Sequence, residues 1–129
     1  MKIHIIDDNE DITTMFFKYF TIREHSCSVS NDGHNGINMI TTNHYDVILL
    51  DLAMPEFSGF DIIAELQQSG KIAKLNIVAL TASSVSQELE GVMKKMGVKA
   101  VLRKPMDPDD LLNFLQKIKD EPVKELFVK

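Results

Sequence analysis

The sequence predicts an α/β fold in which helices cover both faces of one five-stranded parallel sheet. Short apolar runs alternate with segments of helical period along the chain, and this alternation is typical of repeated strand–helix units. A length of 129 residues suits one domain of ordinary size with a real hydrophobic core. We therefore expect one domain over residues 1–120 and a short C-terminal tail over 121–129.

Five short apolar runs have the length and composition of buried strands. They occupy residues 2–6, 27–30, 47–50, 76–80 and 100–102. Because parallel neighbours cannot be joined by a tight turn, each pair of consecutive strands needs a crossover, which is usually a helix.

Apolar residues at helical spacing mark four of these helices, within residues 12–20, 62–66, 85–96 and 111–118. In the third of them, the apolar positions are Val85, Leu89, Val92, Met93 and Met96. A helix over 35–42 has a lower propensity because it contains a glycine and two threonines, yet the topology requires a crossover there.

Capping and turn signals support these boundaries. Ser84 with Gln87 resembles a capping box, Gly97 is placed to end a helix, and Pro108 suits the first turn of the last helix. The segment Asn31-Asp32-Gly33 is expected to be a turn.

Composition and charge argue against several classes of protein. With 44% hydrophobic and 26% charged residues, the chain has the composition of a globular protein. No run approaches the roughly 18 apolar residues of a membrane span, and no secretory signal is recognisable, so the expected compartment is the cytoplasm. A net charge of −5 argues against direct binding to nucleic acid, which normally needs a basic face.

The cysteine and the histidines give no indication of a metal or redox site. Cys27 is the single cysteine, so it cannot form an internal disulfide, and it is expected to be a buried thiol in a strand. The four histidines share no helical face or ligand spacing, so they are expected to be surface or strand residues.

The informative residues lie where the predicted strands end. The first strand runs into Asp7 and Asp8, the third into Asp51, the fourth into Thr81 and the fifth into Lys104. Since parallel strands point the same way, all of these side chains are delivered to one edge of the sheet. Ligands of open α/β sheets bind at that edge.

Three carboxylates at one edge repel one another unless a cation lies among them. Ligands that are all oxygen atoms select Mg²⁺ or Mn²⁺ over zinc. Asp51 could then attack phosphorus to form an aspartyl phosphate. The metal ion and Lys104 would neutralise the phosphoryl oxygens, and the Thr81 hydroxyl would donate a hydrogen bond to one of them.

Over nearly its whole length the chain resembles the receiver domains of two-component response regulators. The segments that carry this resemblance are Ile5-Ile6-Asp7-Asp8, Leu49-Leu50-Asp51-Leu52-Ala53-Met54-Pro55 with Gly59, Leu80-Thr81-Ala82, and Lys104-Pro105. The resemblance implies a flavodoxin-like, doubly wound (βα)5 fold with strand order 2-1-3-4-5. It also implies a cis peptide bond between Lys104 and Pro105.

The same resemblance implies a role for each residue at the predicted site. A sensor histidine kinase or a phosphotransfer protein would donate the phosphoryl group, and Asp51 would accept it. Asp8 would be a direct metal ligand, Asp7 a ligand through water, and the backbone carbonyl of Ala53 a further ligand. Thr81 would sense the phosphoryl group, while Lys104 would pair with it.

One position departs from the family pattern. Many receiver domains carry an aromatic residue three positions before the lysine, and its rotamer changes on activation, but this chain has Val101 there. The readout is therefore expected to use Thr81 and the loop and helix that follow it.

Four functions are compatible with some or all of these residues. The leading expectation is a stand-alone phosphoacceptor switch, with only self-phosphorylation and slow autodephosphorylation, that acts on a separate effector protein. It would be a monomer or a weak, phosphorylation-dependent dimer. A phosphate sink or phosphorelay intermediate would share every site residue. A phosphatase would usually need a second acid where Ala53 stands, and a degenerate receiver would not keep the acids, Thr81 and Lys104.

Overall fold

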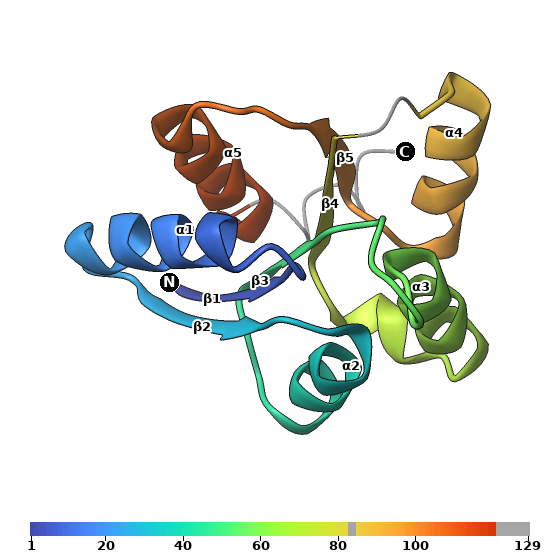
Figure 1. Cartoon of the computed structure of the whole chain (residues 1–129). Coiled ribbons are helices and arrows are strands. Elements are labelled where there is room, and N and C mark those ends of the chain that lie inside the picture. The colour runs from blue at the N-terminus through green and yellow to red at the C-terminus, as the bar shows by residue number, and fades with distance from the viewer. Residues whose placement is uncertain (83–84, 121–129) are drawn as a thin grey trace.

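The structure is a computed structural model that describes residues 1–82 and 85–120. Its five parallel strands form one sheet with the order β2-β1-β3-β4-β5, which confirms the predicted doubly wound topology (Figure 1). The strands are β1 (Lys2–Ile6), β2 (Ser26–Ser30), β3 (Val47–Leu50), β4 (Ile77–Thr81) and β5 (Ala100–Arg103). The predicted strands agree with these bounds to within one residue at each end.

Five α-helices and one short 3₁₀ helix connect the strands. They are α1 (Glu10–Ile22), α2 (Gly33–Thr42), α3 (Gly59–Gln68), the 3₁₀ helix η1 (Lys71–Lys74), α4 (Gln87–Met96) and α5 (Pro108–Asp120). Helices α1 and α5 lie on one face of the sheet, and α2, α3 and α4 lie on the other (Figure 1). The helix α2, which had the weakest propensity, is present and begins two residues earlier than predicted, because Asp32 caps it.

The alternation of side chains along each strand builds two apolar layers. On β1, Ile3 and Ile5 pack with Phe20 of α1 and Leu111 of α5. Ile6 points to the opposite face and joins the larger cluster beneath α2, α3 and α4. Both faces of the sheet are therefore buried, as a doubly wound fold requires.

The helix α4 differs from its prediction in start and in burial. It begins at Gln87 and is capped by Ser86, whose hydroxyl accepts from the Leu89 N–H, whereas Ser84 lies outside the described residues. Val85 precedes the helix and is buried. Leu89 and Val92 are 37% and 51% exposed, so the predicted apolar face is only partly covered. The 121–129 tail also lies outside the described residues.

Other local predictions had mixed outcomes. Gly97 ends α4 with φ of 123° and Pro108 begins α5, both as predicted. Cys27 is half-buried in β2, and burial raises the pKa of its thiol to about 12. Within residues 1–82 and 85–120, no helix has both the length and the apolarity that crossing a membrane requires.

His4 is the one histidine that lies in the core of the described chain. It is fully buried on β1, where its Nδ1 lies 2.6 Å from the Ser28 hydroxyl and its Nε2 lies 2.8 Å from the Ser30 hydroxyl. Its ring stacks on Tyr45 with 4.7 Å between the centroids. The histidine is thus a structural link between β1 and β2.

Candidate functional site

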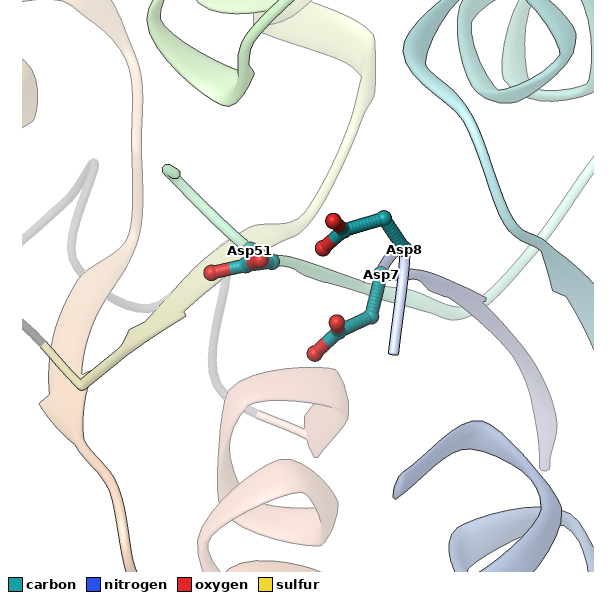
Figure 2. Close-up of side chains that lie close together, drawn as sticks. All are labelled: Asp7, Asp8 and Asp51. Carbon is teal, nitrogen blue, oxygen red and sulfur yellow. The ribbon is translucent and has the colours of Figure 1, made fainter. Parts of the chain in front are cut away.

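The carboxyl ends of β1 and β3 bring three predicted acids together. Ile6 pairs with Leu50 in neighbouring strands, so Asp7 and Asp51 leave the sheet side by side. One carboxylate oxygen from each of Asp7, Asp8 and Asp51 lies within 4.8 Å of the others. Figure 2 shows Asp7 and Asp8 extending from the end of β1 beside Asp51. Asp7 and Asp51 are buried, whereas Asp8 is exposed to solvent.

Lys104 reaches this cluster from the end of β5. Its Nζ donates to the Asp7 carboxylate at 2.7 Å and lies 3.7 Å from the Asp51 carboxylate. The Lys104 side chain is only 16% exposed, so these ion pairs are shielded from water. The peptide bond to Pro105 is cis, as the resemblance implied. In this state the ammonium is bound most closely to Asp7.

Thr81 completes the set of residues predicted at this edge. It lies at the end of β4, between β3 and β5, and is 1% exposed. The Thr81 carbonyl accepts the Lys104 N–H at 2.8 Å, so the backbone that carries Lys104 is fixed to β4. The structure thus brings Thr81 and Lys104 to the edge where the acids lie, and the role of the Thr81 hydroxyl stays a prediction.

The charges of the cluster do not balance without a further cation. Burial raises the pKa of Asp51 to about 6, and the charge on Asp7 adds to the rise. Lys104 and the Ala53 N–H act in the opposite direction but are too weak to cancel these effects. Asp51 is therefore an acid whose ionised form is disfavoured in the folded chain.

The loop after β3 fixes the backbone around Asp51. A side chain at Gly59 would bring its Cβ within 2.3 Å of the Asp51 carbonyl oxygen, so only glycine fits there. Glu56 has φ of 66°, and the Phe57 N–H donates to the Pro55 carbonyl across it at 2.8 Å. This tight turn holds a non-glycine residue in the left-handed region, a conformation that needs support from its surroundings.

Ala53 lies in the same loop and contacts Asp51 directly. Its N–H donates to the Asp51 carboxylate at 3.4 Å, and the residue is exposed. The predicted role of the Ala53 carbonyl as a metal ligand stays a prediction. The donors that the cluster offers are hard oxygen atoms with a surplus of negative charge, and this chemistry fits Mg²⁺ or Mn²⁺.

Two asparagines contact Asp7, and we did not predict either contact. The Asn9 N–H donates to the Asp7 carboxylate at 2.9 Å, while Asn9 caps α1 with its own side chain. The Asn31 side chain donates to the Asp7 backbone carbonyl at 3.0 Å. A turn motif predicts the backbone path of Asn31 but not which distant carbonyl its amide meets.

The chain matches the model of the response regulator receiver domain over residues 3–116. Two relatives are response regulator SaeR of Staphylococcus aureus, 27% identical, and the probable transcriptional regulator ycf29 of Pyropia yezoensis, 23% identical. The matches cover 95% and 91% of this chain. The chain spans about half the length of each relative, 55% and 52% respectively.

Solved structures of receiver proteins superpose closely on this fold. The receiver domain of the Francisella response regulator 1452 has a TM-score of 0.83 at 26% identity, covering 93% of this chain and 97% of that one. The Vibrio cholerae chemotaxis protein CheY4 has a TM-score of 0.80 at 26% identity, covering 91% and 97%. The match extends over most of the chain and includes both strands that carry the acids, so this chain belongs to the family of response regulator receiver domains.

Proposed function

We propose that this chain is a Mg²⁺-dependent switch that accepts a phosphoryl group on Asp51 from a histidine kinase or a phosphotransfer protein. Receiver domains as a family are phosphoacceptor switches of two-component systems. The observation that carries the assignment here is the convergence of Asp7, Asp8 and Asp51 within 4.8 Å, with the Lys104 ammonium 3.7 Å from the Asp51 carboxylate.

The transfer needs a nucleophile and a way to disperse charge. One carboxylate oxygen of Asp51 forms a bond to phosphorus while the bond from phosphorus to the donor's imidazole nitrogen breaks. The electron pair of the broken bond stays on that nitrogen, which leaves as the imidazole of the donor. The aspartyl phosphate that results is an acyl phosphate.

Metal binding is assigned to the acids at the ends of β1 and β3. Mg²⁺ held there would neutralise the carboxylates and the phosphoryl oxygens during transfer. Asp8 is exposed and suits direct coordination, whereas Asp7 is buried behind it and already accepts from Lys104 and Asn9. This arrangement supports a direct ligand at Asp8 and a water-mediated one at Asp7.

Lys104 and Thr81 would connect the new charge to the rest of the fold. Lys104 pairs most closely with Asp7, and phosphorylation would draw its ammonium toward the oxygens added at Asp51. Thr81 would donate its hydroxyl to another of these oxygens. Because the Lys104 N–H is bonded to the Thr81 carbonyl, the ends of β4 and β5 would respond together.

The test is phosphorylation by a small donor. Incubation with acetyl phosphate and Mg²⁺ should add the mass of one phosphoryl group to the intact chain, and removal of Mg²⁺ should prevent this. Asp51→Asn should abolish the adduct, whereas Asp11→Asn, which changes an exposed acid of α1, should leave it unchanged. A full adduct in Asp51→Asn, mapped to another residue, would refute the assignment.

A further inference from the structure

We propose that Asn31 is a positioning residue for Asp7, which it holds by the backbone at the end of β1. The inference rests on the function proposed for the acid cluster, but it concerns a residue outside that cluster. Asn31 follows directly after β2, an edge strand of the sheet.

The Asn31 side-chain amide makes two contacts with different elements. Its Nδ2 donates to the Asp7 carbonyl oxygen at 3.0 Å and to the Thr13 hydroxyl at 3.1 Å. Thr13 is buried in the first turn of α1, where its hydroxyl also lies 3.2 Å from the Glu10 carbonyl. Both hydrogens of one amide group are thus used to join the ends of β1 and β2 to the start of α1.

These contacts fix both sides of Asp7. The backbone N–H of Asp7 donates to the Ser30 carbonyl at 3.1 Å. The Asp7 carbonyl accepts from the side chain of Asn31, the residue that follows Ser30. The ladder between β1 and β2 ends at the pair Ile6 and Ser30. The Asn31 side chain therefore extends the pairing by one residue, although the backbone itself has already turned toward α2.

A fixed backbone matters at Asp7 because several groups interact with its carboxylate. It accepts from the Lys104 ammonium and from the Asn9 N–H, and its charge contributes to the raised pKa of Asp51. If the carbonyl of Asp7 lost its donor, the residue would be freer to turn toward Lys104 and away from a cation. Groups that orient a metal ligand in this way usually affect metal affinity.

The alternative is that Asn31 only stabilises the turn between β2 and α2. On that view its loss would lower the free energy of unfolding and leave the binding of Mg²⁺ unchanged. Asn31 is exposed and lines an open cavity of about 340 Å³ between α1 and β2, so alanine would leave no sealed void there. The Asn31→Ala variant is therefore expected to fold.

The experiment is a Mg²⁺ titration followed by NMR on the whole chain. Asn31→Ala should weaken Mg²⁺ binding on the order of tenfold, as expected for loss of a group that orients a metal ligand. Asn35→Ala is the matched control, since Asn35 is an exposed asparagine of the adjoining helix whose side chain forms no hydrogen bond with residues 1–82 or 85–120, and this variant should bind Mg²⁺ as wild type does. Equal affinity in the two variants, in chains that remain folded, would overturn the proposal.

A second measurement needs no substitution. Because linkage is reciprocal, Mg²⁺ bound at the acid cluster must strengthen the hydrogen bond from Asn31 that favours its binding. Adding Mg²⁺ to the wild-type chain should slow the exchange of the Asn31 side-chain amide hydrogens and leave those of Asn35 unaffected. Unchanged exchange at Asn31 would contradict the proposal even if Asn31→Ala did not fold.

The outcomes also separate this proposal from the function on which it rests. If the wild-type chain bound no Mg²⁺ and gained no phosphoryl mass, the proposed function itself would be wrong. If it did both, and Asn31→Ala did so with the same affinity, only the role of Asn31 would be wrong.

Discussion

Within a few residues, β1 passes from an apolar core into a buried cluster of like charges. Ile3, Ile5 and Ile6 are almost completely covered by carbon atoms of the two apolar layers. Asp7, the next residue, is equally buried, but it lies beside Asp51 and Asp8 with one ammonium group among them. The faces of the sheet thus favour folding, whereas its carboxyl edge opposes it.

This contrast explains how the site is held ready for a cation. Burial of apolar surface contributes about 25 cal/mol per Å² and fixes the strand ends from which the acids project. The acids are therefore held close together although their charges repel. A binding site of this kind is maintained by the rest of the fold, and removing its charge should stabilise the protein.

The largest expected effect is a loss of core packing. Phe20 is fully buried and stacks on Phe16 with 5.6 Å between the ring centroids, so Phe20→Ala should lower the free energy of unfolding by about 3 to 5 kcal/mol. Urea denaturation measures this loss. Phe17→Ala, on the 41% exposed neighbour in the same helix, should lower it by far less, and a similar loss in both variants would mean that the core is misplaced.

The second prediction has the opposite sign and concerns the edge. The pKa of Asp51 is raised from 3.8 to about 6, so at pH 7 its ionised form destabilises the folded chain by up to about 3 kcal/mol. Asp51→Asn should therefore raise the free energy of unfolding at pH 7 without Mg²⁺. The gain should disappear below about pH 4, where the carboxyl group is protonated in both states. If Asp51→Asn lowered the free energy of unfolding at pH 7, the claim that the Asp51 carboxylate destabilises the folded chain would be contradicted.

A third prediction concerns His4, the polar exception within an apolar face. Burial lowers its pKa from 6.5 to about 4, so the unfolded chain binds a proton there at higher pH than the folded chain does. The contribution of the buried, neutral His4 ring to the free energy of unfolding is fully present above about pH 6.5 and is lost as the pH falls toward 4. Between pH 7.5 and 5 the loss should be about 2 kcal/mol.

The pH dependence of His4→Gln isolates this contribution from those of other groups. Denaturation of the variant and of wild type at several pH values should show a smaller acid loss in the variant. His44→Gln, which changes an exposed histidine, should keep the wild-type pH dependence. Identical slopes for wild type and His4→Gln would show that the ring is not buried in its neutral form.

The smallest effect is expected in α4, whose described residues include one fully buried side chain, that of Met93. Within residues 1–82 and 85–120, apart from the neighbouring residues and the backbone of α4 itself, no atom lies within 4 Å of a Cβ built at Gly91, so alanine would meet no clash there. Gly91→Ala should stabilise the helix by about 0.5 to 1 kcal/mol. Hydrogen exchange of the backbone amides in α4 should slow accordingly. Adding beryllofluoride should shift the NMR signals of α4 by a different amount in this variant than in wild type.

The alternative for Gly91 is close packing against another element, and the open space around it in the described part of the chain argues against this alternative. A clearly lowered unfolding midpoint in Gly91→Ala would revive it. If hydrogen exchange in α4 of wild type is no faster than in the other helices, the expectation that α4, the helix after Thr81, carries the readout would lose its support.

The sequence pattern was sufficient to predict the parallel sheet and the residues at its carboxyl edge. The spacing of apolar residues and the residues that follow each strand are local features of the sequence. Asp7, Asp51, Thr81 and Lys104 could therefore be placed at one edge from the sequence alone. The family resemblance supplied the strand order, the cis bond at Pro105 and the roles that the experiments above test.

Other features depend on contacts between distant residues and could not be predicted. The pairing of Lys104 with Asp7, closer than with Asp51, results from side-chain packing at the end of β5. The burial of His4 depends on serines of β2, which are polar residues that normally indicate an exposed strand. The exposure of Leu89 and Val92 shows that helical spacing predicts a face but not whether another element covers it.

The most direct test of the contrast between core and edge is the Mg²⁺ dependence of unfolding. In wild type, Mg²⁺ should raise the free energy of unfolding as the site fills, because the ion binds the folded chain and relieves the repulsion at Asp51. Asp51→Asn should begin more stable than wild type and gain less from the ion. Equal stability of the two chains without Mg²⁺, and an equal gain with it, would contradict the account.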